Sequence, residues 1–256
     1  MENSSSADPA PSPKPAPTER VALITGASRG LGYTLAEFLA RQQWTLILTA
    51  RHEKPMGAAA ERLRAAGAMV TAVPGDVARP RDRRAIAAAA RRAGRLDLLV
   101  NNASELGPSP LPPLLEHPLP ALRHVFEVNV LAPIALVRAC LPLLSSSRGL
   151  VINITSDAAR GGYPGWGGYG SSKAALELVS KTLANELRDA GVGVVAVDPG
   201  DLRTQMHQDA FPGQDISDRP LPDVTLPFWA WLEGQDPARV SGLRFEAQGT
   251  VWEVPA

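Results

Sequence analysis

The chain has 256 residues, 26 basic and 26 acidic side chains, and one cysteine, Cys140. This length suits one α/β domain or two small ones, and the balanced charge disfavours a nucleic-acid or anionic-membrane partner. A single cysteine excludes an internal disulfide, and neither a metal-ligand spacing among the four histidines nor an apolar run long enough for a membrane span is present.

Residues 1–20 are rich in Pro, Ser and Ala and lack large apolar side chains. Such a segment cannot bury enough surface to offset its ordering entropy, so the sequence predicts a disordered tail. The tail lacks the features of a secretory signal or a transit peptide, and a cytoplasmic protein is therefore expected. The folded domain would span 21–256.

From residue 21 onward, short apolar runs alternate with segments of helical periodicity, the first helix being marked by Leu31, Leu35 and Leu39. Strands that are apolar throughout are typical of a parallel sheet covered on both faces. The sequence therefore predicts a single-domain, Rossmann-like, doubly wound α/β fold. The expected strands are 21–25, 45–50, 68–76, 96–102, 150–156, 192–200 and, more weakly, 243–247; the later helices are 57–66, 82–93, 119–144 with an interruption near Pro133, and 169–189.

Two long loops would emerge at the carboxyl ends of the strands, where such sheets bind ligands. One is the proline-rich stretch 107–120, and the other is the irregular segment 201–225. Further along, FWAWL (228–232) is expected to pack in the core or at an interface.

The stretch TGASRGLG (25–32) joins the first strand to the first helix. Gly26 would take the tight turn, while Gly30 and Gly32 would remove side chains where backbone meets a pyrophosphate and where helix meets sheet. The helix N-terminus, with Ser28, Arg29 and Leu31 in the same loop, would bind that anion. A plain strand-to-helix turn is the alternative, but it needs fewer glycines.

The end of the second strand indicates which dinucleotide binds. NAD-binding sheets place an acidic residue there, whereas this chain has Arg51. Arg51 and Arg29 together suit a 2′-phosphate, so NADP(H) is favoured over NAD(H). Arg51 as an ordinary solvated strand-end residue is the alternative.

With these residues in place, the chain resembles the short-chain dehydrogenase/reductase family from Val21 to about Thr204. The matching motifs occur in the family's order and number nine: TGASRGLG, Asp76-Val77, Asn101-Asn102-Ala103, Asn129, Ser156, Tyr169, Lys173, Asp198-Pro199-Gly200 and Thr204. By this resemblance Asp76 and Val77 would hold the adenine, and Asn102 and Ala103 would line the ribose side. Thr204 and the backbone of Pro199, Gly200 and Leu202 would contact the nicotinamide.

The resemblance also implies a catalytic set of Asn129, Ser156, Tyr169 and Lys173. Tyr169 and Lys173 are spaced i, i+4 on one helix face, and an ammonium beside a phenol should lower the phenol's pKa. Tyr169 would then act as the acid or base, while Lys173 would also bond the nicotinamide ribose. Ser156 would bond the substrate oxygen, and Asn129 would kink its helix and hold a relay water.

These features predict NADPH-dependent, reversible reduction of a small ketone or aldehyde, with no metal. The alternative is a non-catalytic NADP(H)-binding sensor or scaffold. The chain departs from the family at Ser104, where glycine often stands, and in the C-terminal segment 226–256. A homo-oligomer, dimer or tetramer, is expected. In the family the C-terminal segment often builds the subunit interface, so its departure here leaves open which of the two forms.

Overall fold

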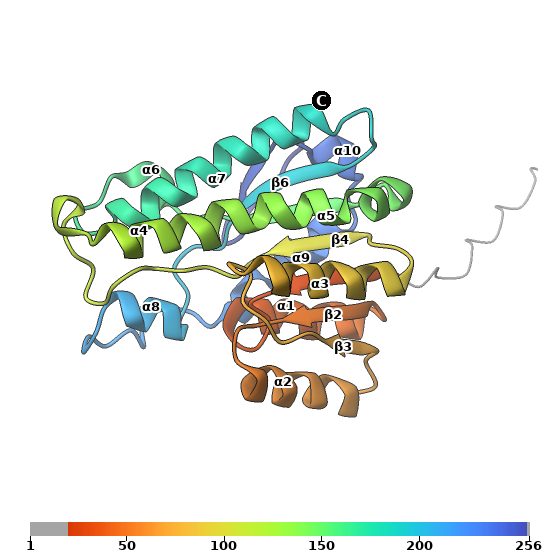
Figure 1. Ribbon diagram of the computed structural model, residues 1–256, viewed down its shortest axis with the longest axis horizontal. Coiled ribbons are helices and arrows are strands. Elements are labelled where there is room, and N and C mark those ends of the chain that lie inside the picture. Colours follow the sequence, from red (N-terminus) through yellow and green to blue (C-terminus); the bar gives the residue numbers. More distant parts are fainter. Residues whose placement is uncertain (1–19, 255–256) are drawn as a thin grey trace, which may run out of the picture.

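The computed structural model describes residues 20–254, so the predicted tail lies outside the described residues apart from Arg20. Seven parallel strands form one sheet in the order β3-β2-β1-β4-β5-β6-β7 (Figure 1). The strands are β1 (Val21–Thr25), β2 (Thr45–Thr49), β3 (Val70–Ala72), β4 (Leu98–Asn101), β5 (Leu150–Ile154), β6 (Gly193–Asp198) and β7 (Arg244–Glu246). The order reverses between β1 and β4, which confirms the predicted doubly wound fold.

Helices cover both faces of the sheet, because its central strands are apolar on both sides. Figure 1 shows one layer in front of the strands: α3 (Pro80–Ala93), α5 (Ala132–Ser147) and α7 (Gly167–Glu186). The other layer contains α1 (Gly30–Arg41), α2 (Glu53–Ala65), α9 (Leu226–Glu233) and α10 (Pro237–Val240). Each layer shares its own apolar core with the sheet.

The long helix before β5 is interrupted as expected, but earlier than Pro133. It runs as α4 (Leu119–Phe126), a π-helical turn η2 (Glu127–Leu131) and α5. Residues 119–147 are long and apolar enough to cross a membrane by length and composition, yet half of the apolar window is buried inside the protein. Leu136, Val137 and Cys140 pack in the front core, as in an ordinary core helix.

Two element predictions needed correction. The third strand was expected over 68–76, but regular strand geometry covers only Val70–Ala72. The N–H groups of Val73 and Gly75 still donate to the carbonyls of Leu48 and Ala50, and the chain leaves the sheet at Asp76. The segment 201–225 was expected to be irregular, yet it contains the short helix α8 (Gln205–Ala210) and the 3-10 turn η3 (Pro222–Thr225). Thr204 caps α8 by accepting a hydrogen bond from the His207 N–H, a local signal that the sequence carried.

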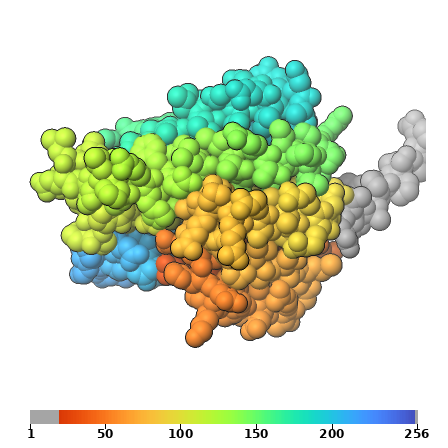
Figure 2. Space-filling view, viewed as in Figure 1, coloured from red at the N-terminus to blue at the C-terminus, as the bar shows by residue number. Residues whose placement is uncertain are grey.

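The two loops at the carboxyl edge meet in space. In Figure 2 the blue residues of α8 lie directly below the yellow-green residues that precede and begin α4. The Ser109 hydroxyl donates to the Asp209 carbonyl across this junction. The remaining short helices are η1 (Leu114–Glu116) in the first loop and α6 (Ala158–Gly161) after β5.

The C-terminal segment packs on the back core. Phe228 is fully buried, and its ring lies 4.9 Å from Trp229, 5.7 Å from Phe245 and 5.4 Å from Trp252, measured between centroids. The predicted packing role of 228–232 is therefore confirmed, and the weak strand prediction at 243–247 is confirmed as β7.

We expect Phe228→Ala to lower the free energy of unfolding by about 3–5 kcal/mol, because it opens a cavity beside the rings of Trp229, Trp231, Phe245 and Trp252. Leu178→Ala, at a side chain that is 67% exposed on α7, is the matched control and should cost less than about 1 kcal/mol. Urea unfolding followed by circular dichroism measures both. Equal losses in the two variants would contradict this packing.

Candidate functional site

A cavity of about 640 Å³ opens at the carboxyl edge of the sheet, beside the point where the strand order reverses. It brings together residues from the ends of β1, β2, β4, β5 and β6. The predicted site residues that line it are Gly26, Ser28, Arg29, Gly30, Leu31, Arg51, Val77, Asn102, Ala103, Ser156, Tyr169, Pro199, Gly200, Leu202 and Thr204. Gly32, Asp76, Asn129 and Lys173 lie behind this wall.

The glycine loop needs its glycines for close packing. Gly26 has φ +67°, and a Cβ there would lie 2.8 Å from the Asn102 side-chain nitrogen. A Cβ on Gly32 would lie 2.6 Å from the Gly26 carbonyl oxygen. Asn102 fixes the loop by donating from Nδ2 to the carbonyls of Thr25 and Gly26. Only glycine therefore allows the loop to lie this close to the end of β4.

The first turn of α1 is suited to an anion. Its N-cap, Arg29, makes no side-chain capping hydrogen bond, and Gly30 and Leu31 face the cavity. Unpaired N–H groups and the partial positive charge of the helix end favour a phosphate at this place. The residues present therefore fit a dinucleotide pyrophosphate.

Arg51 and Arg29 both line the same end of the cavity. The Arg51 side chain is about half exposed, and its Nη1 lies 2.9 Å from Oε2 of Glu105. His124 Nε2 lies 3.8 Å from the same carboxylate oxygen. A phosphate bound at Arg51 would thus lie near a carboxylate that already pairs with this guanidinium.

Asp76 is turned into its own loop. Its Oδ1 accepts from the Ala78 N–H, and its backbone N–H donates to Asp82. Val77, the next residue, is 6% exposed and lines the cavity. Of the pair expected at the adenine, the structure brings Val77 to the cavity wall, while Asp76 shapes the turn that presents it.

Tyr169 and Lys173 lie on the buried face of α7, which packs against β5 and β6. The Lys173 ammonium nitrogen lies 5.4 Å from the centroid of the Tyr169 ring and donates to the Ile154 carbonyl at 2.7 Å. Lys173 is only 2% exposed, whereas Tyr169, at 9%, forms part of the cavity wall. The expected shared face is confirmed.

The expected lowering of the Tyr169 pKa by Lys173 is not found. Burial raises the pKa of Tyr169 above its ordinary range, and hydrogen bonds with Ser104 and Ser156 only partly oppose this shift. Burial also lowers the pKa of Lys173 from 10.5 to about 7, against the nearby charge of Asp198. Desolvation outweighs the attraction because neither charged form is solvated there.

Ser156 and Asn129 are held on either side of this pair. Ser156 Oγ donates to Asp157 at 2.9 Å and accepts from the Ala158 N–H, at the end of β5. Asn129 lies in the π-helical turn and is 1% exposed. Its amide bonds both the N–H and the carbonyl of Glu105, and also Ser172 on α7.

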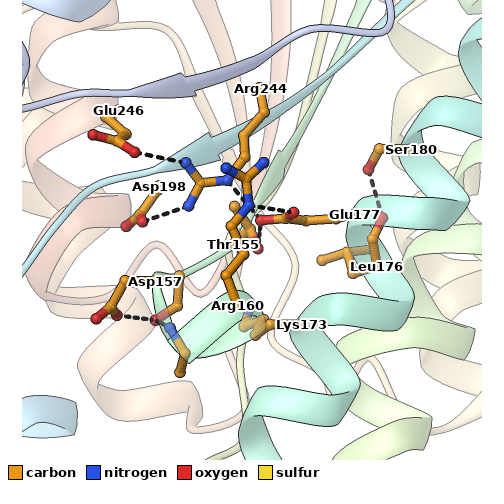
Figure 3. A network of polar contacts seen from close by, with 12 residues as sticks. Thr155, Asp157, Arg160, Lys173, Leu176, Glu177, Ser180, Asp198, Arg244 and Glu246 are labelled. Carbon is orange, nitrogen blue, oxygen red and sulfur yellow. Dashed lines mark hydrogen bonds and ion pairs between the residues drawn. The ribbon is translucent and has the colours of Figure 1, made fainter. Parts of the chain in front are cut away.

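Behind the site, Arg244 of β7 connects three segments (Figure 3). Its guanidinium, in a side chain only 8% exposed, lies 2.7 Å from Glu177 on α7 and 2.8 Å from Asp198 at the end of β6. Glu177 also accepts from the Thr155 hydroxyl, next to Ser156, and pairs with Arg160. One local signal hints at this network: Glu177 follows Lys173 at i+4 on the same helix.

This network and the Glu105 pair were not anticipated from the sequence. Arg244 lies 67 residues from Glu177 and 46 from Asp198 along the chain. Arg51 lies 54 residues from Glu105, and no short motif marks such pairs. Chemically, one part of the cavity presents the Tyr169 phenol, backed by the buried Lys173, and the Ser156 hydroxyl. Another part presents the first turn of α1 with two arginines. This is an arrangement that can bind a dinucleotide beside a small polar group.

The lowered pKa of Lys173 has a consequence for stability. The unfolded chain holds the lysine proton up to about pH 10.5, whereas the folded protein releases it near pH 7. Because the unfolded state binds more protons in this window, stability should rise with pH from about 7 to 9. Lys173→Met should remove this rise, and Lys181→Met, at an exposed position on the same helix, should keep it.

Urea midpoints of the cofactor-free protein at several pH values test this expectation. Parallel pH dependences in the wild type and Lys173→Met would show that Lys173 does not release its proton in this window.

The comparisons with known proteins agree with this geometry. The family described as short chain dehydrogenase matches residues 20–215. The uncharacterised oxidoreductase YciK of Escherichia coli is 33% identical over 240 residues, covering 90% of this chain and 92% of that protein.

Two solved structures are similar over 90% of this chain. A short chain dehydrogenase from Shigella flexneri in complex with NADP has a TM-score of 0.84 at 32% identity, with 98% of that chain covered. A short chain dehydrogenase from Escherichia coli CFT073 in complex with NADPH has a TM-score of 0.82 at 33% identity, with 97% of that chain covered. This chain therefore belongs to the short chain dehydrogenase family and is an NAD(P)-dependent oxidoreductase.

Proposed function

We propose that the protein reduces a ketone or aldehyde to an alcohol with NADPH, and runs the reverse reaction when alcohol and NADP+ are supplied. The observation that carries this proposal is that Tyr169, Ser156 and the glycine loop line one and the same cavity, with Lys173 buried behind Tyr169. Bound NADPH supplies the hydride.

The protein's own groups would handle the oxygen. As the carbonyl carbon gains the hydride, negative charge develops on oxygen and must be neutralised. Tyr169 donates the proton, which its raised pKa keeps bound at neutral pH, and the Ser156 hydroxyl orients the oxygen. Lys173, when protonated, stabilises the phenolate that remains. Asn129 fixes the 104–106 backbone and α7 relative to each other through Glu105 and Ser172.

The preference for NADP(H) over NAD(H) rests on charge. Arg29 in the glycine loop and Arg51 after β2 both line the cavity, and guanidinium groups suit a 2′-phosphate. The two similar structures bound to NADP and NADPH support the same assignment. Asp76-Val77, Asn102-Ala103 and the 199–204 segment complete the proposed cofactor site.

The wider setting is part of the proposal. The partner would be a small carbonyl or alcohol, with neither nucleic acid nor membrane involved, since the net charge is zero. The one cysteine, buried and free, fits a cytoplasmic location. A homo-oligomer remains a prediction.

Tyr169→Phe should keep NADPH binding and lose at least about a thousandfold in turnover, because it removes the hydroxyl proposed to donate the proton. NADPH oxidation at the nicotinamide absorbance, with a panel of ketones and aldehydes, measures turnover, and calorimetry measures binding. Wild-type protein that binds NADPH but turns over no carbonyl would instead indicate a sensor or scaffold. Undiminished turnover in Tyr169→Phe would exclude the proposed role of the phenol.

Arg51→Ala should weaken NADPH binding about tenfold and leave NADH binding nearly unchanged, because it removes one charge-assisted contact to the 2′-phosphate. Arg92→Ala, at an exposed arginine of α3 away from the cavity, is the matched control. Titration of each variant with both reduced cofactors gives the four dissociation constants. An equal loss for NADH and NADPH would place Arg51 outside the 2′-phosphate site.

A further inference from the structure

An aromatic surface extends from Tyr169 away from the glycine loop. The Trp166 ring meets the Tyr169 ring edge-on, with centroids 5.7 Å apart, and the Phe211 ring lies 5.9 Å from Trp166. His207 continues the series at 5.0 Å from Phe211. Trp166, Phe211 and His207 all line the cavity, so a molecule whose carbonyl reaches Tyr169 would have rings against its remaining atoms.

Aliphatic side chains complete this end of the cavity. Leu106 and Met206 line it, and with Leu111 and Ala210 they form a small apolar cluster around Tyr169 and Trp166. This cluster is separate from the two cores that hold the sheet to its helices. Its apolar surface is available to a ligand because the cavity passes through it, and aromatic ligands gain most from such contacts.

The charges at this end are negative. Asp157 and Asp201 line the cavity here, whereas its lining arginines, Arg29 and Arg51, are at the glycine-loop end. Asp201 is compensated by Arg219, 3.3 Å away, and lies 3.9 Å from His207.

Within residues 20–254, Asp157 has no ion-pair partner within 4 Å, and its exposed carboxylate accepts only from neutral groups, such as the Ser156 hydroxyl (Figure 3). Among the described residues that line this end, His207 is the basic side chain, and it lies next to the Asp201 carboxylate; Lys173 lies behind Tyr169. An anionic substrate would therefore meet Asp157 at the position where its carbonyl approaches Ser156.

Building on the proposed reductase activity, we propose that the substrate is an aromatic ketone or aldehyde that is neutral or positively charged, and that Asp157 disfavours anionic carbonyl compounds. The aromatic surface would favour substrates that carry a ring, and the unpaired Asp157 carboxylate would favour those without a negative charge. The Asp157 carboxylate and the aromatic surface together disfavour two classes of anionic substrate: aliphatic keto acids, and ketoacyl thioesters whose carrier bears phosphate groups.

Three acetophenones that differ only in the para substituent test the charge selection: the methyl ester, the free carboxylate and the trimethylammonium compound. We expect kcat/KM for the ester and the ammonium compound to exceed that for the carboxylate by about fivefold or more, as one nearby charge near the surface would produce. The difference should shrink in high salt, because Asp157 is exposed.

Asp157→Asn should bring the carboxylate within about twofold of the ester, because it removes the charge but keeps the oxygen that accepts from Ser156. Asp223→Asn, at an exposed aspartate that does not line the cavity, is the matched control and should retain the discrimination. Equal kcat/KM for the three acetophenones in wild-type protein would overturn the role of Asp157.

Phe211→Ala tests the aromatic surface without touching Tyr169. It should lower kcat/KM for the methyl ester about tenfold and that for butanedione, which has no ring, less than twofold. Equal losses for both substrates, or wild-type preference for an aliphatic keto acid, would overturn the proposed substrate class and leave the reductase proposal intact.

Calorimetric titration of the NADP+ complex with the same acetophenones separates the two proposals. If no carbonyl is reduced but the ester and the ammonium compound bind at least about fivefold tighter than the carboxylate, the reductase proposal fails and the binding preference stands. Binding without preference overturns the inference whatever the turnover.

Discussion

The ion pairs of Arg244 hold together the segments on which the site is built. One guanidinium, in a side chain that is only 8% exposed, bridges the last strand, the end of β6 and the helix that carries Tyr169 and Lys173. A buried carboxylate is tolerated only when paired, and here Glu177 and Asp198 share one partner. Burial raises the pKa of Asp198, while Arg244 and the Gly200 N–H oppose that shift.

This arrangement connects the C-terminal segment to the chemistry. Burial is the main cause of both pKa shifts on α7, but the charge of Asp198 adds to the raised pKa of Tyr169 and opposes the lowering of the pKa of Lys173. The carboxylate at the end of β6 therefore influences both side chains. The segment that departs most from the family thus supplies the residue that controls this carboxylate. Although this C-terminal segment differs from the family, it is connected to the site through the Arg244–Asp198 ion pair.

The sequence predicted much of this molecule, because apolar strands and glycine turns are local signals. Strand β1 follows from five consecutive buried residues, and the loop at 25–32 follows from three glycines with defined steric neighbours. The helix α8 escaped prediction because six residues carry too little periodicity to be distinguished from a loop. The partners of Arg244 and Glu105 escaped because only the folded chain brings them together.

The Tyr169 and Lys173 pair shows a different limit. Spacing correctly placed the two side chains on one face, but it contains no information about how much solvent each retains. The attraction expected of an ammonium depends on its being charged, and burial at 2% exposure works against that charge. A pKa argument from the sequence therefore needs the depth of the site as well as the spacing.

Asn129 has one more consequence. Its side-chain amide bonds the N–H and the carbonyl of the same residue, Glu105, at 2.8 and 2.9 Å, which is the pattern that a neighbouring strand would offer. The side chain thus bonds Glu105 as a peptide group of an antiparallel strand would, four residues beyond the end of β4. Asn129 belongs to the π-helical turn η2, and this turn carries its amide at the position where both bonds to Glu105 form. The segment after β4 that lines the cavity is therefore attached to this helix by the amide of one side chain.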